Sequence, residues 1–374
     1  MLNSVRYAHM LAGTMLCVLA ASIQAQELNN VEPKTFQQRD FKLTSGQVLP
    51  ELKIAYETYG KLAPDGRNAV LITHGYTSSH HAAGRYKPDD PQPGGWDGLI
   101  GPGKAIDTNR LFVVASNNLG SSYGSTSPSH INPATGKPYG PDFPMFTIVD
   151  TIAAQKALLD GLGVKHLVAV AGSSYGGRLA FLWGVTYPDF MSGIVPVVIT
   201  PNSPNNPKAI ESLRERLATD PNWNGGWYYD NGGITKVLTE IRVQTLKNYG
   251  IDAALKEDFP DPAARDAEIV RRAEPWARRF DGHSLIVLRR AAMGIDIERD
   301  FPKMKAKVLY VLSTTDKLFP PSIAPRVMEK LKTAGVEAEF FELKSELGHS
   351  ASGPDWAKWS PKLKEFMARL SQAR

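Results

Sequence analysis

The stretch "VAVAGSSYGGR", residues 168–178, places Ser174 between Gly172 and Gly176 directly after a short apolar run. The pattern predicts a buried strand, a tight turn and a helix. In such a unit the two glycines let backbones approach closely, while the serine takes a strained conformation that projects its hydroxyl above the sheet. We therefore expect Ser174 to be a nucleophile. A serine in an ordinary glycine-rich bend is the alternative interpretation of the five residues alone.

A serine nucleophile needs a histidine base, and the base needs an orienting carboxylate. Where the nucleophile follows a strand in this way, the partners come in the order serine, acid, histidine. Asp316 lies just past the predicted strand at 308–312, and His349 lies in a loop after the apolar segment "AEFFEL". We expect Asp316 to be the acid and His349 the base. The alternatives are a helix cap for Asp316 and a surface-loop histidine for His349.

Acyl chemistry also needs hydrogen-bond donors for an oxyanion. The backbone amide of Tyr175, which follows the nucleophile, is one predicted donor. The second is expected from the loop after an early central strand, and the amide of Tyr76 in "AVLITHGYTSSHH" is the candidate. The three histidines of that loop, at positions 74, 80 and 81, lack the spacing and the nearby carboxylate of a metal site. We expect them to build the loop and the pocket wall, and we expect no metal and no cofactor.

The strand pattern predicts a mostly parallel central sheet with helices on both faces, because continuous valine-rich and isoleucine-rich runs are typical of strands buried on two sides. These runs occur at 69–73, 111–115, 166–171, 194–199 and 308–312. Alternating apolar and polar residues at 40–59 predict an antiparallel hairpin before them. Helices are predicted at 149–160, 178–187 and 356–371.

Residues 201–300 interrupt this rhythm with charged helical patterns and no convincing buried strand. We interpret them as a helical lid inserted between two parts of one core, 26–200 and 301–374. The lid contains an aromatic cluster, of which Trp227 and Tyr228 are candidates for the substrate pocket. Packing of these aromatics against the body of the protein is the alternative.

Composition excludes several classes of protein. The 374 residues are 42% hydrophobic and 22% charged, as in a globular chain with a large core. The 43 basic and 38 acidic residues are scattered, without a basic stripe, so we expect no nucleic-acid partner. The partner we expect is a small-molecule ester or thioester. The oligomeric state is left open, and a homodimer is compatible with the sequence.

The first 25 residues resemble a secretory signal peptide. Arg6 precedes the apolar stretch Met10 to Ala21, and Ile23-Gln24-Ala25 offers a small residue for cleavage. A membrane anchor is the alternative, but the stretch is shorter than the roughly 20 residues that span a bilayer. The single cysteine, Cys17, lies in this segment. The segment predicts a periplasmic or secreted protein without a transmembrane anchor after cleavage.

Six motifs along the chain resemble the homoserine O-acetyltransferase group of the α/β-hydrolase superfamily. They are "THGYTSSHHAAGRY", the long block at 95–144, "GSSYGGR", "DPNWNGGWYY", "RFDGHS" and "DKLFPP". The resemblance covers roughly residues 40 to 370. It implies an α/β-hydrolase fold with a helical lid, an acyl-enzyme on Ser174, and Asp316 and His349 as acid and base.

Two positions depart from the group's pattern. Tyr175 stands where these enzymes usually carry methionine, and Ser350 stands where they usually carry an aspartate that helps to hold the amino group of homoserine. Acetyl-CoA and methionine biosynthesis also belong to the cytoplasm. We therefore expect an exported serine hydrolase acting on small esters or thioesters. The alternatives are an acyltransferase moving an acetyl group from acetyl-CoA to a small alcohol, and a non-catalytic binding protein.

Overall fold

The computed structural model describes residues 28–372. The predicted signal peptide, residues 1–25, lies outside this part of the chain. No helix within the described part has the length and apolar character needed to cross a bilayer.

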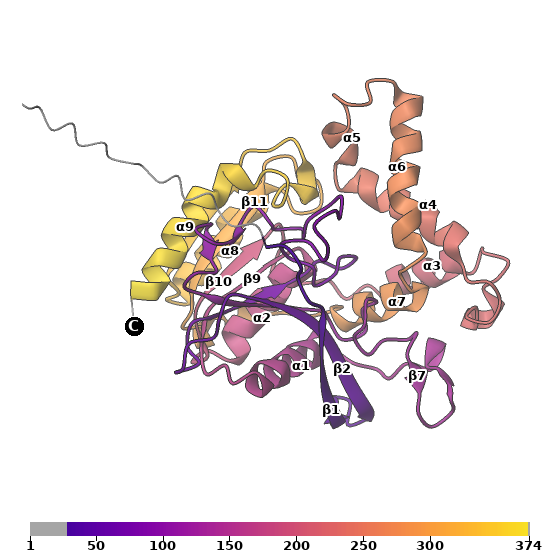
Figure 1. Ribbon diagram of the computed structural model, residues 1–374, viewed down its shortest axis with the longest axis horizontal. Helices are drawn as coiled ribbons and strands as arrows, with labels where there is room; N and C mark the ends of the chain where they lie inside the picture. Colours follow the sequence, from indigo (N-terminus) through magenta and orange to yellow (C-terminus); the bar gives the residue numbers. More distant parts are fainter. Residues whose placement is uncertain (1–27, 373–374) are drawn as a thin grey trace, which may run out of the picture.

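An eight-stranded sheet forms the centre of the molecule (Figure 1). Its strands, in order across the sheet, are β1 (Lys34–Lys42), β2 (Val48–Tyr59), β6 (Phe112–Ser116), β3 (Ala69–Thr73), β9 (Leu167–Ser173), β10 (Met191–Val197), β11 (Lys307–Ser313) and β12 (Ala338–Leu343). β1 and β2 form the antiparallel hairpin, and β2 is also antiparallel to β6. The remaining neighbours pair in parallel. This is the α/β-hydrolase fold that the apolar runs and the resemblance predict. Two short pairs lie outside the sheet, β4 (Ile100–Gly101) with β5 (Ile106–Asp107) and β7 (Ile131–Asn132) with β8 (Lys137–Pro138).

Helices cover both faces of the sheet, because successive strand residues point to opposite sides. Three helices, α1 (Ile148–Gly161), α2 (Tyr175–Thr186) and α8 (Ala324–Thr333), pack on one face. On the other face lies α9 (Trp356–Gln372), whose Trp359, Leu363 and Phe366 share a core with Val70 and Ile72 of β3.

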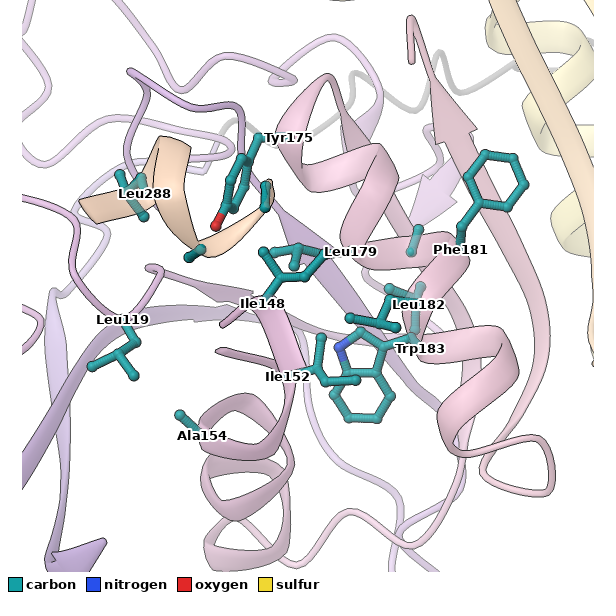
Figure 2. Close-up of a cluster of buried hydrophobic side chains, with 14 of the residues drawn as sticks. Leu119, Ile148, Ile152, Ala154, Tyr175, Leu179, Phe181, Leu182, Trp183 and Leu288 are labelled. Carbon is teal, nitrogen blue, oxygen red and sulfur yellow. The ribbon is translucent and has the colours of Figure 1, made fainter. Parts of the chain in front are cut away.

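The contact between α1 and α2 fixes the helix that follows Ser174. In Figure 2, Leu179 and Trp183 of α2 lie beside Ile148 and Ile152 of α1, and all four are buried. The indole nitrogen of Trp183 donates to Gln155 Oε1 at 2.8 Å, so its polar atom is satisfied inside the core. α2 therefore has a fixed position relative to the strands on which it packs.

Five α-helices lie between β10 and β11 in the sequence. They are α3 (Pro207–Leu217), α4 (Thr235–Asn248), α5 (Ile251–Ala254), α6 (Pro262–Ala277) and α7 (Gly282–Ala291). Figure 1 shows them, in pink and orange, gathered to one side of the sheet. α4 packs against α6, and α3 packs against α7. Several of their ends are capped by side chains, among them Asn206 for α3 and Asp281 for α7.

Candidate active site

Ser174 stands between β9 and α2 with φ 54° and ψ −124°. A serine with positive φ is held in a strained conformation. The flanking glycines are required by close backbone approach, because a Cβ atom on Gly172 would lie 2.5 Å from the carbonyl oxygen of Thr73, and one on Gly176 would lie 2.1 Å from it. The carboxyl end of β3 is thus in close backbone contact with the turn. No residue larger than glycine fits at either position without moving the backbone of β3.

Three side chains predicted from the sequence meet at this turn. The Nε2 atom of His349 lies 2.8 Å from Ser174 Oγ, and its Nδ1 atom lies 2.8 Å from Asp316 Oδ2. Asp316 and His349 are both buried, with 2% and 6% of their surfaces exposed. The other carboxylate oxygen of Asp316 accepts the backbone amides of Leu318 and Phe319. The carboxylate is therefore held by the loop after β11 and faces the imidazole.

The rings of two aromatic residues hold the imidazole of His349 from its sides. The Tyr249 ring lies 4.6 Å from it and the Phe319 ring 5.6 Å, measured between centroids. Tyr249 follows α4, and Phe319 follows β11. These contacts restrict the imidazole to the position between Ser174 and Asp316.

The backbone amides of Tyr76 and Tyr175 are the predicted oxyanion donors. Tyr175 is the first residue of α2, so its amide has no acceptor within the helix. Within residues 28–372 neither amide donates to a protein acceptor. The Tyr76 side chain is anchored by a hydrogen bond from its hydroxyl to the carbonyl of Leu285, which fixes the loop after β3 against α7. Both donors thus remain available beside Ser174.

His74 stabilises the start of that loop. Its Nδ1 atom lies 2.8 Å from the carbonyl oxygen of Gly75, and its Nε2 atom lies 2.7 Å from Asn117 Oδ1. Burial lowers the pKa of His74 below its ordinary value. A neutral imidazole therefore ties the β3 loop to the segment after β6.

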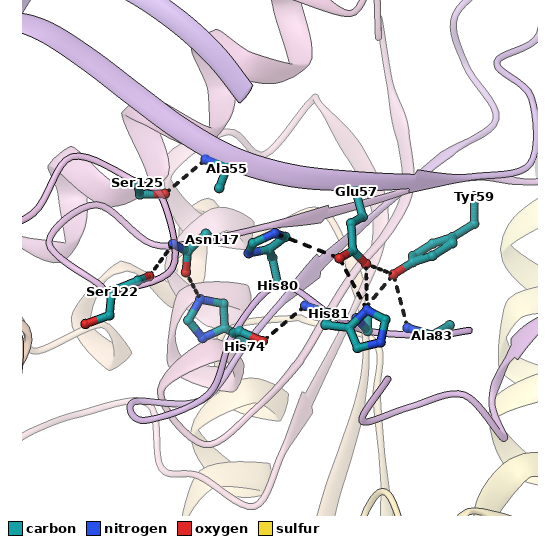
Figure 3. A network of polar contacts seen from close by, with 12 residues as sticks. Ala55, Glu57, Tyr59, His74, His80, His81, Ala83, Asn117, Ser122 and Ser125 are labelled. Atoms are coloured by element: carbon teal, nitrogen blue, oxygen red, sulfur yellow. Dashed lines mark hydrogen bonds and ion pairs between the residues drawn. The ribbon is translucent and has the colours of Figure 1, made fainter. Parts of the chain in front are cut away.

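A buried carboxylate organises the wall next to this loop (Figure 3). Glu57 accepts a hydrogen bond from the Tyr59 hydroxyl and lies 3.2 Å from Nδ1 of His81. Its burial alone would raise its pKa, but hydrogen bonds from His81 and Tyr59 hold the pKa below the ordinary value. The Tyr59 hydroxyl in turn accepts the amides of Ala82 and Ala83. The network therefore fixes residues 81–83. No group of described residues has the arrangement of a metal site.

Two cavities meet at Ser174. The first, of about 470 Å³, is lined by the β3 loop, by Trp96 and Tyr123, and by residues 349–350 and 352–354. The second, of about 330 Å³, lies against α2 and the loops after β10 and β11. Ser174 and His349 line both. A reacting group can therefore reach the serine from either cavity.

Sequence reasoning missed a cation in the first cavity. Arg242 of α4 is half-buried and donates to Thr77 Oγ1 at 2.8 Å, while its Nε atom has no partner. Its guanidinium lies 5.0 Å from the centroid of the Trp276 ring. It pairs with no carboxylate within the described part of the chain. Burial lowers its pKa, as expected of a cation without an acid partner.

The predicted pocket residues lie in different surroundings. Ser350 lines the first cavity and is exposed. Trp227 and Tyr228 line neither cavity. Tyr228 is buried, and its hydroxyl donates to Asp281 while its ring stacks on His283. Trp227 is 38% exposed and packs over Gly140. The structure therefore brings Ser350, but not these two aromatics, to Ser174.

Residues 68–353 match the family described as the alpha/beta hydrolase fold. A homoserine O-acetyltransferase of Symbiobacterium thermophilum is 37% identical over 353 residues, which are 88% of this chain and 92% of that protein. The chain belongs to the homoserine O-acetyltransferase group of this family. Another relative in the group, a homoserine O-succinyltransferase of Halothiobacillus neapolitanus, is 35% identical and covers 89% of each chain.

Solved structures agree with this assignment to the group. The crystal structure of homoserine O-acetyltransferase from Bacillus anthracis superposes with a TM-score of 0.83 at 29% identity, covering 91% of this chain and 98% of that one. An esterase crystal structure also superposes with a TM-score of 0.83, at 30% identity over 90% of this chain and all of the esterase. The group's scaffold therefore carries proteins of both names.

The expectation of an exported serine hydrolase is wrong. The curated relatives, at 35–37% identity over most of the chain, are homoserine O-acyltransferases, so the acyltransferase alternative fits better. The prediction rested on Ser350 and on the amino-terminal segment. A single exposed serine does not separate the two reactions, since both proceed through the same acyl-enzyme and differ only in the acceptor.

The expectation of a periplasmic or secreted location is wrong for the same reason. It conflicts with relatives named for acyl transfer to homoserine, a reaction assigned above to the cytoplasm. The residues that prompted it, 1–25, lie outside the described part of the chain.

Proposed function

We propose that this protein transfers an acyl group from a coenzyme A thioester to the hydroxyl of homoserine, through an acyl-enzyme on Ser174. The observation that carries the proposal is one cavity containing both the Ser174–His349 pair and an arginine without an acid partner, Arg242. The names of the curated relatives supply the acceptor and leave the acyl group open between acetyl and succinyl.

In the first step, Ser174 Oγ attacks the thioester carbonyl carbon while His349 Nε2 accepts the serine proton. The new C–O bond leaves a negative charge on the carbonyl oxygen, which the amides of Tyr76 and Tyr175 stabilise. The C–S bond then breaks, and the thiolate takes the proton from His349. Asp316 holds the imidazole in the required tautomer and stabilises it while it is charged.

In the second step, the homoserine hydroxyl loses its proton to His349 Nε2 as its oxygen attacks the ester carbonyl. The bond to Ser174 Oγ breaks, and the serine regains a proton. Arg242 holds the carboxylate of homoserine, because a guanidinium without an acid partner binds a carboxylate through charge-assisted hydrogen bonds. An ion-paired hydrogen bond contributes about 1.5–3 kcal/mol, which favours the bound alcohol over water as acceptor.

The helices between residues 201 and 300 act as a lid in this proposal. Arg242 of α4 and Trp276 of α6 line the first cavity, so part of the acceptor site comes from these helices. Tyr249, directly after α4, also contacts the ring of His349. The same lid therefore contacts both the acceptor and the base His349. Because of these two contacts, binding of the acceptor is coupled to the exclusion of water from the site.

The experiment is a product analysis with purified protein. Acetyl-CoA or succinyl-CoA is supplied with and without L-homoserine, and O-acylhomoserine, free acid and free thiol are quantified. We expect saturable O-acylhomoserine formation that exceeds release of free acid. L-serine, with a side chain one methylene shorter, is the matched acceptor control and should react more slowly. Release of free acid that is unaffected by homoserine would contradict the proposal.

A further inference from the structure

The second cavity also reaches Ser174, and Arg242 is not among the residues that line it. Its wall is formed by Tyr175 and Arg178 of α2, by the loop after β10, and by Phe319 after β11. It shares Tyr76, Ser174 and His349 with the first cavity. At about 330 Å³ it is near the lower end of ligand pockets, so it suits a small group and not a nucleotide.

A buried arginine lies in the wall of this cavity. Arg178 is 8% exposed, and its Nη2 atom donates to the carbonyl of Asn202 at 3.2 Å. Its Nε atom is buried without a partner. Within residues 28–372, no carboxylate lies within ion-pair distance of it. Burial lowers its pKa to about 10, because the charge is taken out of water without an acid to compensate it.

Arg178 has a fixed relation to the nucleophile. Its amide donates to the carbonyl of Ser174 at 3.1 Å, so Arg178 lies in the first turn of α2, directly after the nucleophile. A helical side chain leans toward the amino terminus of its helix, which for α2 is the end at Ser174. Ser174 and Arg178 both line the second cavity, so Arg178 belongs to the wall of the space that an acyl group on Ser174 would enter.

A buried cation without an acid partner is costly unless a ligand supplies the anion. Arg289 of α7 also lines the cavity, is exposed, and adds positive charge at its edge. The group that fits must be small, anionic, and joined to the reacting carbonyl. The carboxylate at the far end of a four-carbon acyl chain lies about 5 Å from the carbonyl carbon, so an acyl chain on Ser174 that enters this cavity can bring its carboxylate to the wall that contains Arg178.

Building on the proposed function, we propose that the second cavity binds the acyl chain and that Arg178 binds a terminal carboxylate on that chain. The preferred acyl donor is then a thioester of a four-carbon dicarboxylic acid. Homoserine then occupies the first cavity with its own carboxylate on Arg242. Each arginine then binds one carboxylate, Arg242 in the first cavity and Arg178 in the second.

The test compares succinyl-CoA with butyryl-CoA, which has the same chain length and no carboxylate. Thiol release and O-acylhomoserine formation are both measured, for the wild type and for Arg178→Met, which keeps a long unbranched side chain without the charge. We expect the wild type to prefer succinyl-CoA in kcat/KM, and the preference to fall roughly tenfold to a hundredfold in Arg178→Met. Arg290→Met, a half-buried arginine of α7 that lines neither cavity, is the matched control and should keep the wild-type preference.

The outcomes separate this inference from the proposed function. A succinyl preference in thiol release that is lost in Arg178→Met, without any O-acylhomoserine, supports the acyl site and contradicts the acceptor. An equal loss of kcat/KM with both thioesters would indicate that Arg178 binds a phosphate of coenzyme A, and would overturn the inference. A wild-type protein that does not prefer succinyl-CoA would also overturn it.

If neither thioester reacts, the p-nitrophenyl esters of succinate and butyrate replace them, with burst release of nitrophenolate as the measurement. A succinate preference lost in Arg178→Met would support the inference, and its absence would overturn it. Thermal unfolding of each variant identifies any that has failed to fold. If Arg178→Met does not fold, Arg178→Lys replaces it. We expect this variant to keep part of the preference for succinyl-CoA, because the lysine keeps the charge and loses the paired N–H donors of the guanidinium. A preference below that of the wild type supports the inference, and an unchanged preference overturns it.

Discussion

Ser174 Oγ and His349 Nε2 lie 2.8 Å apart, although 175 positions separate them in the chain. The serine is placed by the turn after β9, and the histidine by the loop after β12, so the pair depends on the packing of the sheet.

The position of the imidazole predicts which of two neighbouring serines is reactive. A fluorophosphonate should label Ser174 and not the adjacent Ser173, because only Ser174 is within reach of the imidazole. Peptide mass spectrometry checks this, and an adduct on Ser173 would contradict it.

Asp316→Asn should leave the fold intact and reduce kcat by about 10³–10⁴-fold. The amide oxygen of asparagine can still accept the amides of Leu318 and Phe319, so the loop should hold its shape. The neutral asparagine, however, no longer stabilises the charged form of His349. Steady-state kinetics and thermal unfolding check the two parts, and full activity in this variant would assign the acid to another residue.

Arg242→Met should raise the KM for homoserine roughly tenfold to a hundredfold through loss of an ion-paired hydrogen bond. The KM for the thioester should change much less. Arg278→Met is the control, because Arg278 is exposed and pairs with Glu274 at the surface. Equal changes in both KM values for Arg242→Met would show that the residue acts on the fold of the lid.

Gly176→Ala should destabilise the protein and abolish acyl transfer. The added Cβ atom would lie 2.1 Å from the carbonyl oxygen of Thr73, so β3 or the turn at Ser174 must move. Overpacking of this kind costs about 1–3 kcal/mol in the free energy of unfolding. Gly335→Ala is a useful comparison, since nothing lies within 4 Å of the corresponding atom there and only the strain of its positive φ is added. An active, stable Gly176→Ala protein would contradict the close approach.

Stability should fall as the pH is lowered below about 6.5, and His80 should contribute to the fall. Burial lowers the pKa of His80 to about 4, although Glu57 lies 3.9 Å away. The unfolded chain therefore binds a proton between pH 6.5 and 4 that the folded chain excludes, which costs up to about 2 kcal/mol at pH 5. Denaturant unfolding at pH 7 and pH 5 measures the loss. A loss in His80→Phe as large as in the wild type would exclude His80 as a cause.

Much of the fold and the central residues of the site could be predicted from the sequence. Strands buried on both faces give continuous apolar runs, and Ser174, Asp316 and His349 follow a fixed order at strand ends. Arg178 and Arg242 could not be found this way, because an arginine on a helix usually belongs to a solvated face. Their lack of acid partners is visible only after folding. The aromatic residues Trp227 and Tyr228 are candidates for the substrate pocket from the sequence alone. In the structure, however, Tyr228 stacks on His283 and donates a hydrogen bond to Asp281.

In the proposed reaction homoserine, and not water, takes the acyl group from Ser174. The most direct measurement is a single-turnover chase. The protein is acylated with a limiting amount of succinyl-CoA, the Ser174 peptide is followed by mass spectrometry, and L-homoserine is then added. We predict that the mass of the acyl group appears on that peptide, and that homoserine removes it faster than buffer alone and yields O-succinylhomoserine. An acyl-enzyme that decays to free succinate at the same rate with and without homoserine would contradict the account.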